Sequence, residues 1–154
     1  FGAHVAARPR TSLKTRGNVA MCGTFGYELD PRKLTDDEKA EVKQQIADYR
    51  KYHRLVREGD FYRLVSPTEN AFYCAWEFVS PDKQEAMMTA VVMRQPETRY
   101  CVQRLRGLDP KTYYQDEETG TVYSGAMLMN AGLNLTRDIY EDGTSVTKHF
   151  KAVK

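Results

Sequence analysis

The most regular hydrophobic pattern in the chain is helical and covers residues 35–58. Thr35-Asp-Asp-Glu38 has the form of a capping box, in which the Thr35 hydroxyl and the Glu38 carboxylate each accept a backbone N–H at a helix start. Side chains then recur three and four residues apart on one predicted face, at Val42, Ile46, Tyr49, His53 and Val56. The pattern predicts one long helix that ends at Gly59, a residue type that commonly follows helices.

Apolar residues before this helix form one short run, Val19–Met21, which leads into a turn at Gly23 and Gly26. The order strand, glycine turn, helix is typical of one βα unit of an α/β enzyme. Residues 1–15 show no periodicity and are predicted as a loop that Arg8-Pro9 keeps extended. Because an α/β domain needs several such units, we expect a chain that begins at Phe1 to be cut from a larger enzyme.

The pattern changes from about residue 59 onward to short runs of β-forming residues separated by turn signals such as Ser66-Pro67 and Thr119-Gly120. The predicted strands are 61–65, 71–79, 86–93, 99–105, 112–115, 121–123 and 145–153. One short helix is predicted at 125–131, closed by Gly132. Strands of this length and spacing favour an antiparallel β-sandwich.

Composition and charge exclude several classes of function. The formal charge of +2 without a clustered basic face argues against nucleic acid, and the apolar runs are too short to span a membrane. Three cysteines at scattered positions fit neither a disulfide framework nor a zinc site, and free thiols favour the cytoplasm. His4, His53 and His149 lack metal-ligand spacing, so we expect neither metal nor cofactor.

Few side chains are candidates for chemistry. Glu28 and Asp30 form a carboxylate pair of the kind glycosidases use, but Asp30-Pro31 favours a turn at the helix entrance instead. Cys22 has no histidine near it in sequence to act as a base, which favours a packed thiol over a nucleophile. Trp76 alternates with Cys74 and Phe78, so we predict that it is buried in a core rather than exposed as a sugar-binding platform.

The stretch Arg16–Asp30 resembles the C-terminal part of the bacterial α-galactosidases of glycoside hydrolase family 36. Further segments resemble successive pieces of the same region in the same order. They are Gly2-Ala-His-Val5, Asp60-Phe-Tyr-Arg-Leu64 with Ser66-Pro67, Ala75-Trp76, Phe78-Val-Ser-Pro-Asp-Lys83, Arg104-Leu-Arg-Gly-Leu-Asp-Pro110 and Glu118-Thr-Gly-Thr-Val-Tyr-Ser-Gly125. The resemblance covers nearly the whole chain, with a looser match from Leu135 to Lys154.

This resemblance implies an α+β fragment, with a terminal βα unit of a TIM barrel at residues 1–58 and an antiparallel β-sandwich at residues 59–154. The family hydrolyses α-galactosides with retention, using two aspartates in Lys-Trp-Asp and Ser-Asp-Asp motifs that do not occur in this chain. The implied parent is an α-galactosidase acting on sugars such as raffinose or melibiose, and the chain itself carries no catalytic residue. Its partners would be the rest of the barrel and, in the parent, the galactoside, with Met21, Cys22 and Gly23 contributing to the substrate-pocket wall.

Two alternatives remain open from the sequence. One is a β-sandwich domain that binds carbohydrate without cleaving it. The other is an assembly domain whose tyrosine-rich sheet contacts another subunit, which leaves a homo-oligomer open. Measured affinity for galactosides would favour the first alternative, and an exposed apolar sheet face would favour the second.

Overall fold

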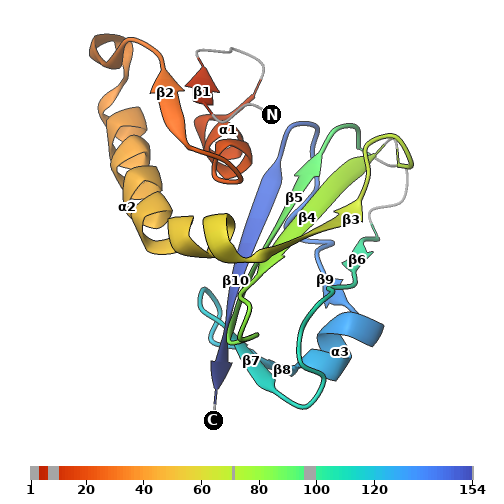
Figure 1. The fold of residues 1–154 in the computed structure, drawn as a ribbon. Helices are drawn as coiled ribbons and strands as arrows, with labels where there is room; N and C mark the ends of the chain where they lie inside the picture. The colour runs from red at the N-terminus through yellow and green to blue at the C-terminus, as the bar shows by residue number, and fades with distance from the viewer. Residues whose placement is uncertain (1–3, 7–10, 71, 96–99, 154) are drawn as a thin grey trace.

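The computed structural model describes residues 4–6, 11–70, 72–95 and 100–153. An N-terminal unit of two strands and two helices lies on one side of a large sheet, and the small strands β6 and β9 lie with α3 on the other side (Figure 1). Predictions that involve Gly2, Ala3, Arg8-Pro9, Ala71, Pro96 and Arg99 lie outside the described residues.

The N-terminal unit begins with a βαβ arrangement. Strands β1 (His4–Ala6) and β2 (Gly26–Glu28) pair in parallel, and helix α1 (Leu13–Ala20) connects them. The predicted strand at Val19–Met21 is therefore wrong, because these residues form the last turn and the C-cap of α1. A short apolar run fits the buried end of a helix as well as a strand. The sequence signal for the start of α1 is Ser12, whose hydroxyl accepts the Thr15 N–H as an N-cap.

The long helix is confirmed as α2 (Asp36–Glu58), including both hydrogen bonds of the capping box. Its buried side differs from the predicted stripe, because Gln45 and Leu55 are the buried residues and His53 is exposed. The Gln45 amide donates to the Leu13 carbonyl of α1, and a Cβ at Gly17 would lie 2.4 Å from Gln45 Cδ. The absence of a side chain at Gly17 is therefore what lets α1 and α2 cross so closely.

Gly59 ends α2 as predicted, but not through a left-handed conformation. Its φ of −78° is one that any residue adopts, and its N–H bonds to the Leu55 carbonyl. A Cβ at this position would come within 2.5 Å of the Leu55 oxygen and 2.9 Å of the Val79 oxygen. Glycine is required at residue 59 because α2 and the sheet approach too closely there to leave room for a side chain.

The main sheet is antiparallel and has six strands in the order β3-β4-β5-β10-β7-β8. Its strands are β3 (Asp60–Val65), β4 (Tyr73–Val79), β5 (Glu85–Val92), β7 (Tyr113–Asp116), β8 (Val122–Ser124) and β10 (Ser145–Val153). A second sheet pairs β6 (Val102–Gln103) with β9 (Leu133–Asn134). β6 lies within the predicted strand 99–105, whereas no strand was predicted at β9. The short helix is α3 (Gly125–Asn130), followed by Gly132 with a φ of 90°.

Each face of the main sheet covers a core of its own. Along β4, Ala75 and Val79 belong to the larger core, which also contains α3 and β9 residues such as Leu128 and Leu133. Trp76 and Phe78 alternate with them and pack with Met21, Leu55 and Met87 under the helices. The predicted α+β class and antiparallel sheet are confirmed, and among the described residues the layer opposite the main sheet has two strands and α3.

The exposed edges of the small parallel sheet predict uneven stability. Among the described residues, β1 and β2 pair only with each other, so their outer N–H and C=O groups have no strand partner. We expect fast amide hydrogen exchange in β1 and β2 and slow exchange in β5 and β10, which have partners on both sides. Exchange is measured by mass spectrometry on the monomer. Equal protection of β2 and β5 would contradict this prediction, because it would show that the small sheet is stable without further strands.

Candidate functional site

An open groove of about 890 Å³ lies between the helices and the main sheet. Its walls come from α1, α2, β10, the β7–β8 turn and the loop that precedes β10. They include Asn18, Asp48, Tyr52, Arg137 and His149. The lining is mainly polar, with acidic and basic side chains on both sides. A volume of this size is in the range of small-molecule sites.

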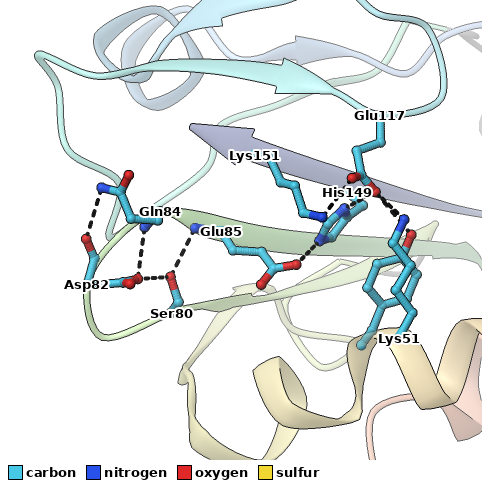
Figure 2. Close-up of polar contacts among 9 residues, drawn as sticks. Lys51, Ser80, Asp82, Gln84, Glu85, Glu117, His149 and Lys151 are labelled. Carbon is cyan, nitrogen blue, oxygen red and sulfur yellow. Dashed lines mark hydrogen bonds and ion pairs between the residues drawn. The ribbon is translucent and has the colours of Figure 1, made fainter. Parts of the chain in front are cut away.

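A cluster of charged side chains lies at one end of this groove, centred on Glu117 in the β7–β8 turn. Glu117 Oε2 lies 2.5 Å from Lys51 Nζ of α2 and 2.7 Å from His149 Nδ1 of β10, while Oε1 lies 2.9 Å from Lys151 Nζ. Figure 2 shows the side chains of Lys51, His149 and Lys151 converging on this one carboxylate.

His149 lies between two carboxylates. Its Nε2 is 2.6 Å from Glu85 Oε1 on β5, on the side opposite Glu117 (Figure 2). The strand register sets this geometry, because Lys151 pairs with Glu85 and His149 pairs with Met87, so these side chains point to the helix-facing side of the sheet. The ring of Tyr52 from α2 covers the imidazole, with 4.3 Å between ring centroids.

The electrostatics of the cluster favour an ionised Glu117 carboxylate. Burial by itself would raise the pKa of Glu117, but hydrogen bonds from Lys51 and Lys151 and the adjacent His149 outweigh it and lower the pKa to about 2. The same carboxylate raises the pKa of Lys51. Glu117 therefore cannot serve as a proton donor, and each of its oxygens is already occupied by a cation.

The cluster holds elements together and does not resemble a hydrolytic pair. Glycosidases need one protonated carboxylic acid and one free carboxylate facing the sugar. Glu85 and Glu117 instead point at the same imidazole. Among the described residues, no group of three His, Cys, Asp or Glu side chains could hold a metal ion.

The residues predicted to form the pocket wall lie just before β2. Met21 is the C-cap of α1, is buried and lines the groove. Cys22 and Gly23 follow in the turn, and the Cys22 thiol donates to the Val19 carbonyl at 2.9 Å. Burial raises the pKa of the Cys22 thiol, which disfavours a nucleophilic role. A contact of these three residues with substrate stays a prediction.

Asp30 and Trp76 behave as their favoured interpretations predicted, and the role of Glu28 stays a prediction. Asp30 accepts from the Arg32 backbone and binds its guanidinium at 2.9 Å, as expected for a turn at the helix entrance. Trp76 is 8% exposed and lies in the core, so it offers no sugar platform.

The charged cluster was missed because its members are far apart in the chain. Lys51, Glu85, Glu117 and His149 lie on four elements. A sequence signal was the placement of Lys148 and His149 at buried positions of strand β10, between Val146 and Phe150. Among the described residues, no helix is long and apolar enough to cross a membrane.

Comparison with known proteins places the chain in a family. The family model described as glycosyl hydrolase family 36 C-terminal domain matches residues 73–150, and the model described as melibiase matches residues 1–59. The chain belongs to glycoside hydrolase family 36. The resemblance inferred from the sequence is thereby confirmed.

Relatives with assigned names are α-galactosidases. Over 142 residues the chain is 48% identical to alpha-galactosidase AgaA of Geobacillus stearothermophilus, covering 88% of this chain and 19% of that protein. It is 43% identical to the bifunctional alpha-galactosidase/sucrose kinase AgaSK of Mediterraneibacter gnavus, covering 88% of this chain and 15% of that protein. The chain thus spans less than a quarter of the length of these relatives.

Solved structures agree with this assignment along nearly the whole chain. The galactosidase domain of AgaSK superimposes with a TM-score of 0.92 at 40% identity, over 99% of this chain and 22% of that one. A variant of the Geobacillus stearothermophilus AgaA in complex with raffinose gives a TM-score of 0.89 at 43% identity, over 97% of this chain and 21% of that one. The fold described here is therefore that of one part of family 36 α-galactosidases.

Proposed function

We propose that this chain is a non-catalytic part of an α-galactosidase that releases terminal α-linked galactose from sugars such as raffinose. The observation that carries the proposal is its membership of family 36, together with relatives that are named α-galactosidases. The chemistry would be a retaining double displacement, in which one carboxylate attacks the anomeric carbon and the other protonates the leaving oxygen. The two aspartate motifs that supply these roles in the family are absent from the sequence of this chain.

We further propose that residues 1–58 belong to a (β/α)8 barrel and residues 59–154 to a domain that supports it. The parallel β1–β2 pair with its α1 connection and the following α2 is the repeating unit of such a barrel. The two family models end and begin at residues 59 and 73, which supports a boundary in this region. The unpaired edges of β1 and β2 would then bind neighbouring strands of the same protein.

A barrel has its active site at the carboxyl ends of its strands. Glu28 and Asp30 lie at that end of β2, whereas Met21, Cys22 and Gly23 precede the strand at its amino end. Cys22→Ser in the longer enzyme that contains this chain tests the predicted pocket wall. A raised KM for raffinose with unchanged stability would support it, and an unchanged KM would remove Cys22 from the pocket.

We propose that the protein is located in the cytoplasm. The three cysteines are free and half-buried, which suits a reducing environment. Alkylation of the protein from its native cells, followed by mass spectrometry of its peptides, should find Cys22, Cys74 and Cys101 as free thiols. A mixed disulfide or a glycan on the native protein would contradict this assignment.

We expect the 154-residue chain alone to hydrolyse no α-galactoside, because the two aspartate motifs of the family are absent from its sequence. Release of nitrophenol from p-nitrophenyl α-galactoside measures this directly. The longer polypeptide containing the same residues is the positive control. Turnover by the chain alone that disappears on Glu28→Gln or Asp30→Asn would contradict the proposal.

A further inference from the structure

Strand β2 leads into a short polar loop that precedes helix α2. The loop contains the 3-10 turn η1 (Pro31–Lys33) and carries an ion pair between Asp30 and Arg32. Because β1 and β2 are parallel, this loop lies at the same edge of the small sheet as the carboxyl end of β1 (Figure 1). In a (β/α)8 barrel that edge surrounds the mouth of the active site.

The backbone of this loop holds Asp30 and Arg32 in one arrangement. Pro31 between them has a fixed φ, and the Lys33 N–H bonds to the Asp30 carbonyl at 3.1 Å. Asp30 Oδ1 accepts the Arg32 backbone N–H at 3.0 Å and Arg32 Nε at 2.9 Å, while Oδ2 accepts from Nη2 at 3.0 Å. This bidentate pair fixes the plane of the guanidinium.

The formation of the turn does not require the guanidinium. The Asp30 carboxylate alone accepts the backbone N–H at the start of η1, as Asn and Ser side chains also do at such positions. The side chain of Arg32 is 88% exposed, and an ion pair with so exposed a partner contributes little to stability. Stability therefore gives little reason for a guanidinium held in a fixed orientation at this edge.

The ion pair offers both hydrogen-bond donors and acceptors to a ligand. Arg32 uses two of its five side-chain N–H groups on Asp30, and the other three have no acceptor in the described part of the chain. Hydrogen bonds from the Arg32 side chain and backbone lower the pKa of Asp30, so its carboxylate stays ionised. Because the two charges balance, the pair favours a neutral ligand with hydroxyl groups over an anion.

We propose that Arg32, held in position by Asp30, binds the leaving-group sugar of the substrate by donating hydrogen bonds to its hydroxyl oxygens. This inference rests on the proposed barrel and the proposed α-galactosidase function. The terminal galactose has to lie at the two catalytic carboxylates, whose motifs are absent from this chain. A loop at the mouth of the barrel faces the part of the substrate that extends outward, which is the neutral saccharide on the other side of the scissile bond.

Arg32→Gln in the longer enzyme that contains this chain tests the contact. The leaving group of raffinose is sucrose, which carries many hydroxyl groups, whereas the p-nitrophenyl leaving group carries none. We expect the ratio of kcat/KM for raffinose to kcat/KM for p-nitrophenyl α-galactoside to fall about tenfold, the size expected for one hydrogen bond to a charged group. The change should come mainly from a higher KM for raffinose.

Two further variants provide a second test and a control. Asp30→Asn keeps an acceptor for the backbone of the turn but releases the guanidinium, so it should lower the same ratio. Combining it with Arg32→Gln should lower the ratio no further, because both changes remove one contact. Lys39→Gln breaks an exposed ion pair with Asp36 in the first turn of α2 and should leave the ratio unchanged.

The two substrates also distinguish this inference from the proposed function. A wild-type enzyme that hydrolyses neither substrate would refute the α-galactosidase function itself. Hydrolysis of both substrates by the wild type, with the same ratio in Arg32→Gln and in Asp30→Asn, would overturn the role of Arg32 alone. An equal loss on both substrates gives that same ratio and counts against the contact as well.

Discussion

Trp76→Ala is expected to lower the free energy of unfolding by about 3–5 kcal/mol, the usual cost of deleting a large buried aromatic side chain. Trp76 is 8% exposed and packs with Phe78, Leu55 and Met87, so its removal leaves a cavity where α2 meets the sheet. Urea denaturation of the two proteins, followed by circular dichroism, measures the difference.

Two further variants separate packing from polarity at Trp76. Its indole nitrogen is buried and has no hydrogen-bond partner among the described residues, so Trp76→Phe loses volume but no hydrogen bond. We expect Trp76→Phe to cost less than half as much as Trp76→Ala. Tyr113→Ala, at an aromatic ring that is 59% exposed, is the matched control and should change stability by less than about 1 kcal/mol. A similar loss at both positions would contradict a core role for Trp76.

Glu77→Gln is expected to stabilise the protein at pH 9 and to have little effect at pH 5. Glu77 is fully buried, and one of its oxygens accepts the Arg106 N–H at 2.9 Å, while the other has no hydrogen-bond partner in the described part of the chain. Burial raises the pKa of this carboxyl from 4.5 to about 8, although the Arg106 N–H acts in the other direction. The folded protein therefore keeps a neutral carboxylic acid at pH 5.

The sign of the pH effect follows from proton counting. Between pH 4.5 and 8 the unfolded chain has released the Glu77 proton and the folded chain has not, so stability falls as the pH rises through this range. The raised pKa of Glu77 corresponds to a loss of at most roughly 5 kcal/mol in the free energy of unfolding at pH 9. Chemical denaturation at pH 5, 7 and 9 should show this decline in the wild type and its absence in Glu77→Gln. Parallel pH profiles for the two proteins would rule out a buried neutral acid.

The environments of Glu117 and Glu77 shift the pKa values of these two carboxyl groups in opposite directions. Glu117 is stabilised as an anion by Lys51 and Lys151, whereas Glu77 is kept neutral by an apolar core. Glu77 lies within the apolar strand β4, between Trp76 and Phe78, whereas Glu117 lies in the turn after β7, between Asp116 and Glu118. Which one is ionised depends on the partner groups that the fold brings to each.

The sequence alone determined the features that depend on neighbouring residues. The capping box of α2 was readable because Thr35 and Glu38 are three residues apart, and the burial of Trp76 followed from its alternation with Cys74 and Phe78 along one strand. The positions of β3, β4, β5, β7, β8 and β10 followed from the same alternation and from the turn residues between them. The seven family-like segments were also sufficient to indicate family 36.

Only the tertiary structure decided the features that depend on distant residues. Val19–Met21 ends a helix because α1 packs on Gln45 of α2 and on Ser145 of β10, contacts that outweigh a local strand preference. The parallel pairing of β1 with β2 and the cluster around His149 join segments that no local pattern relates. Hydrogen bonds and ion pairs form between groups that the folded backbone brings within about 3 Å, and the linear order of residues does not contain that distance.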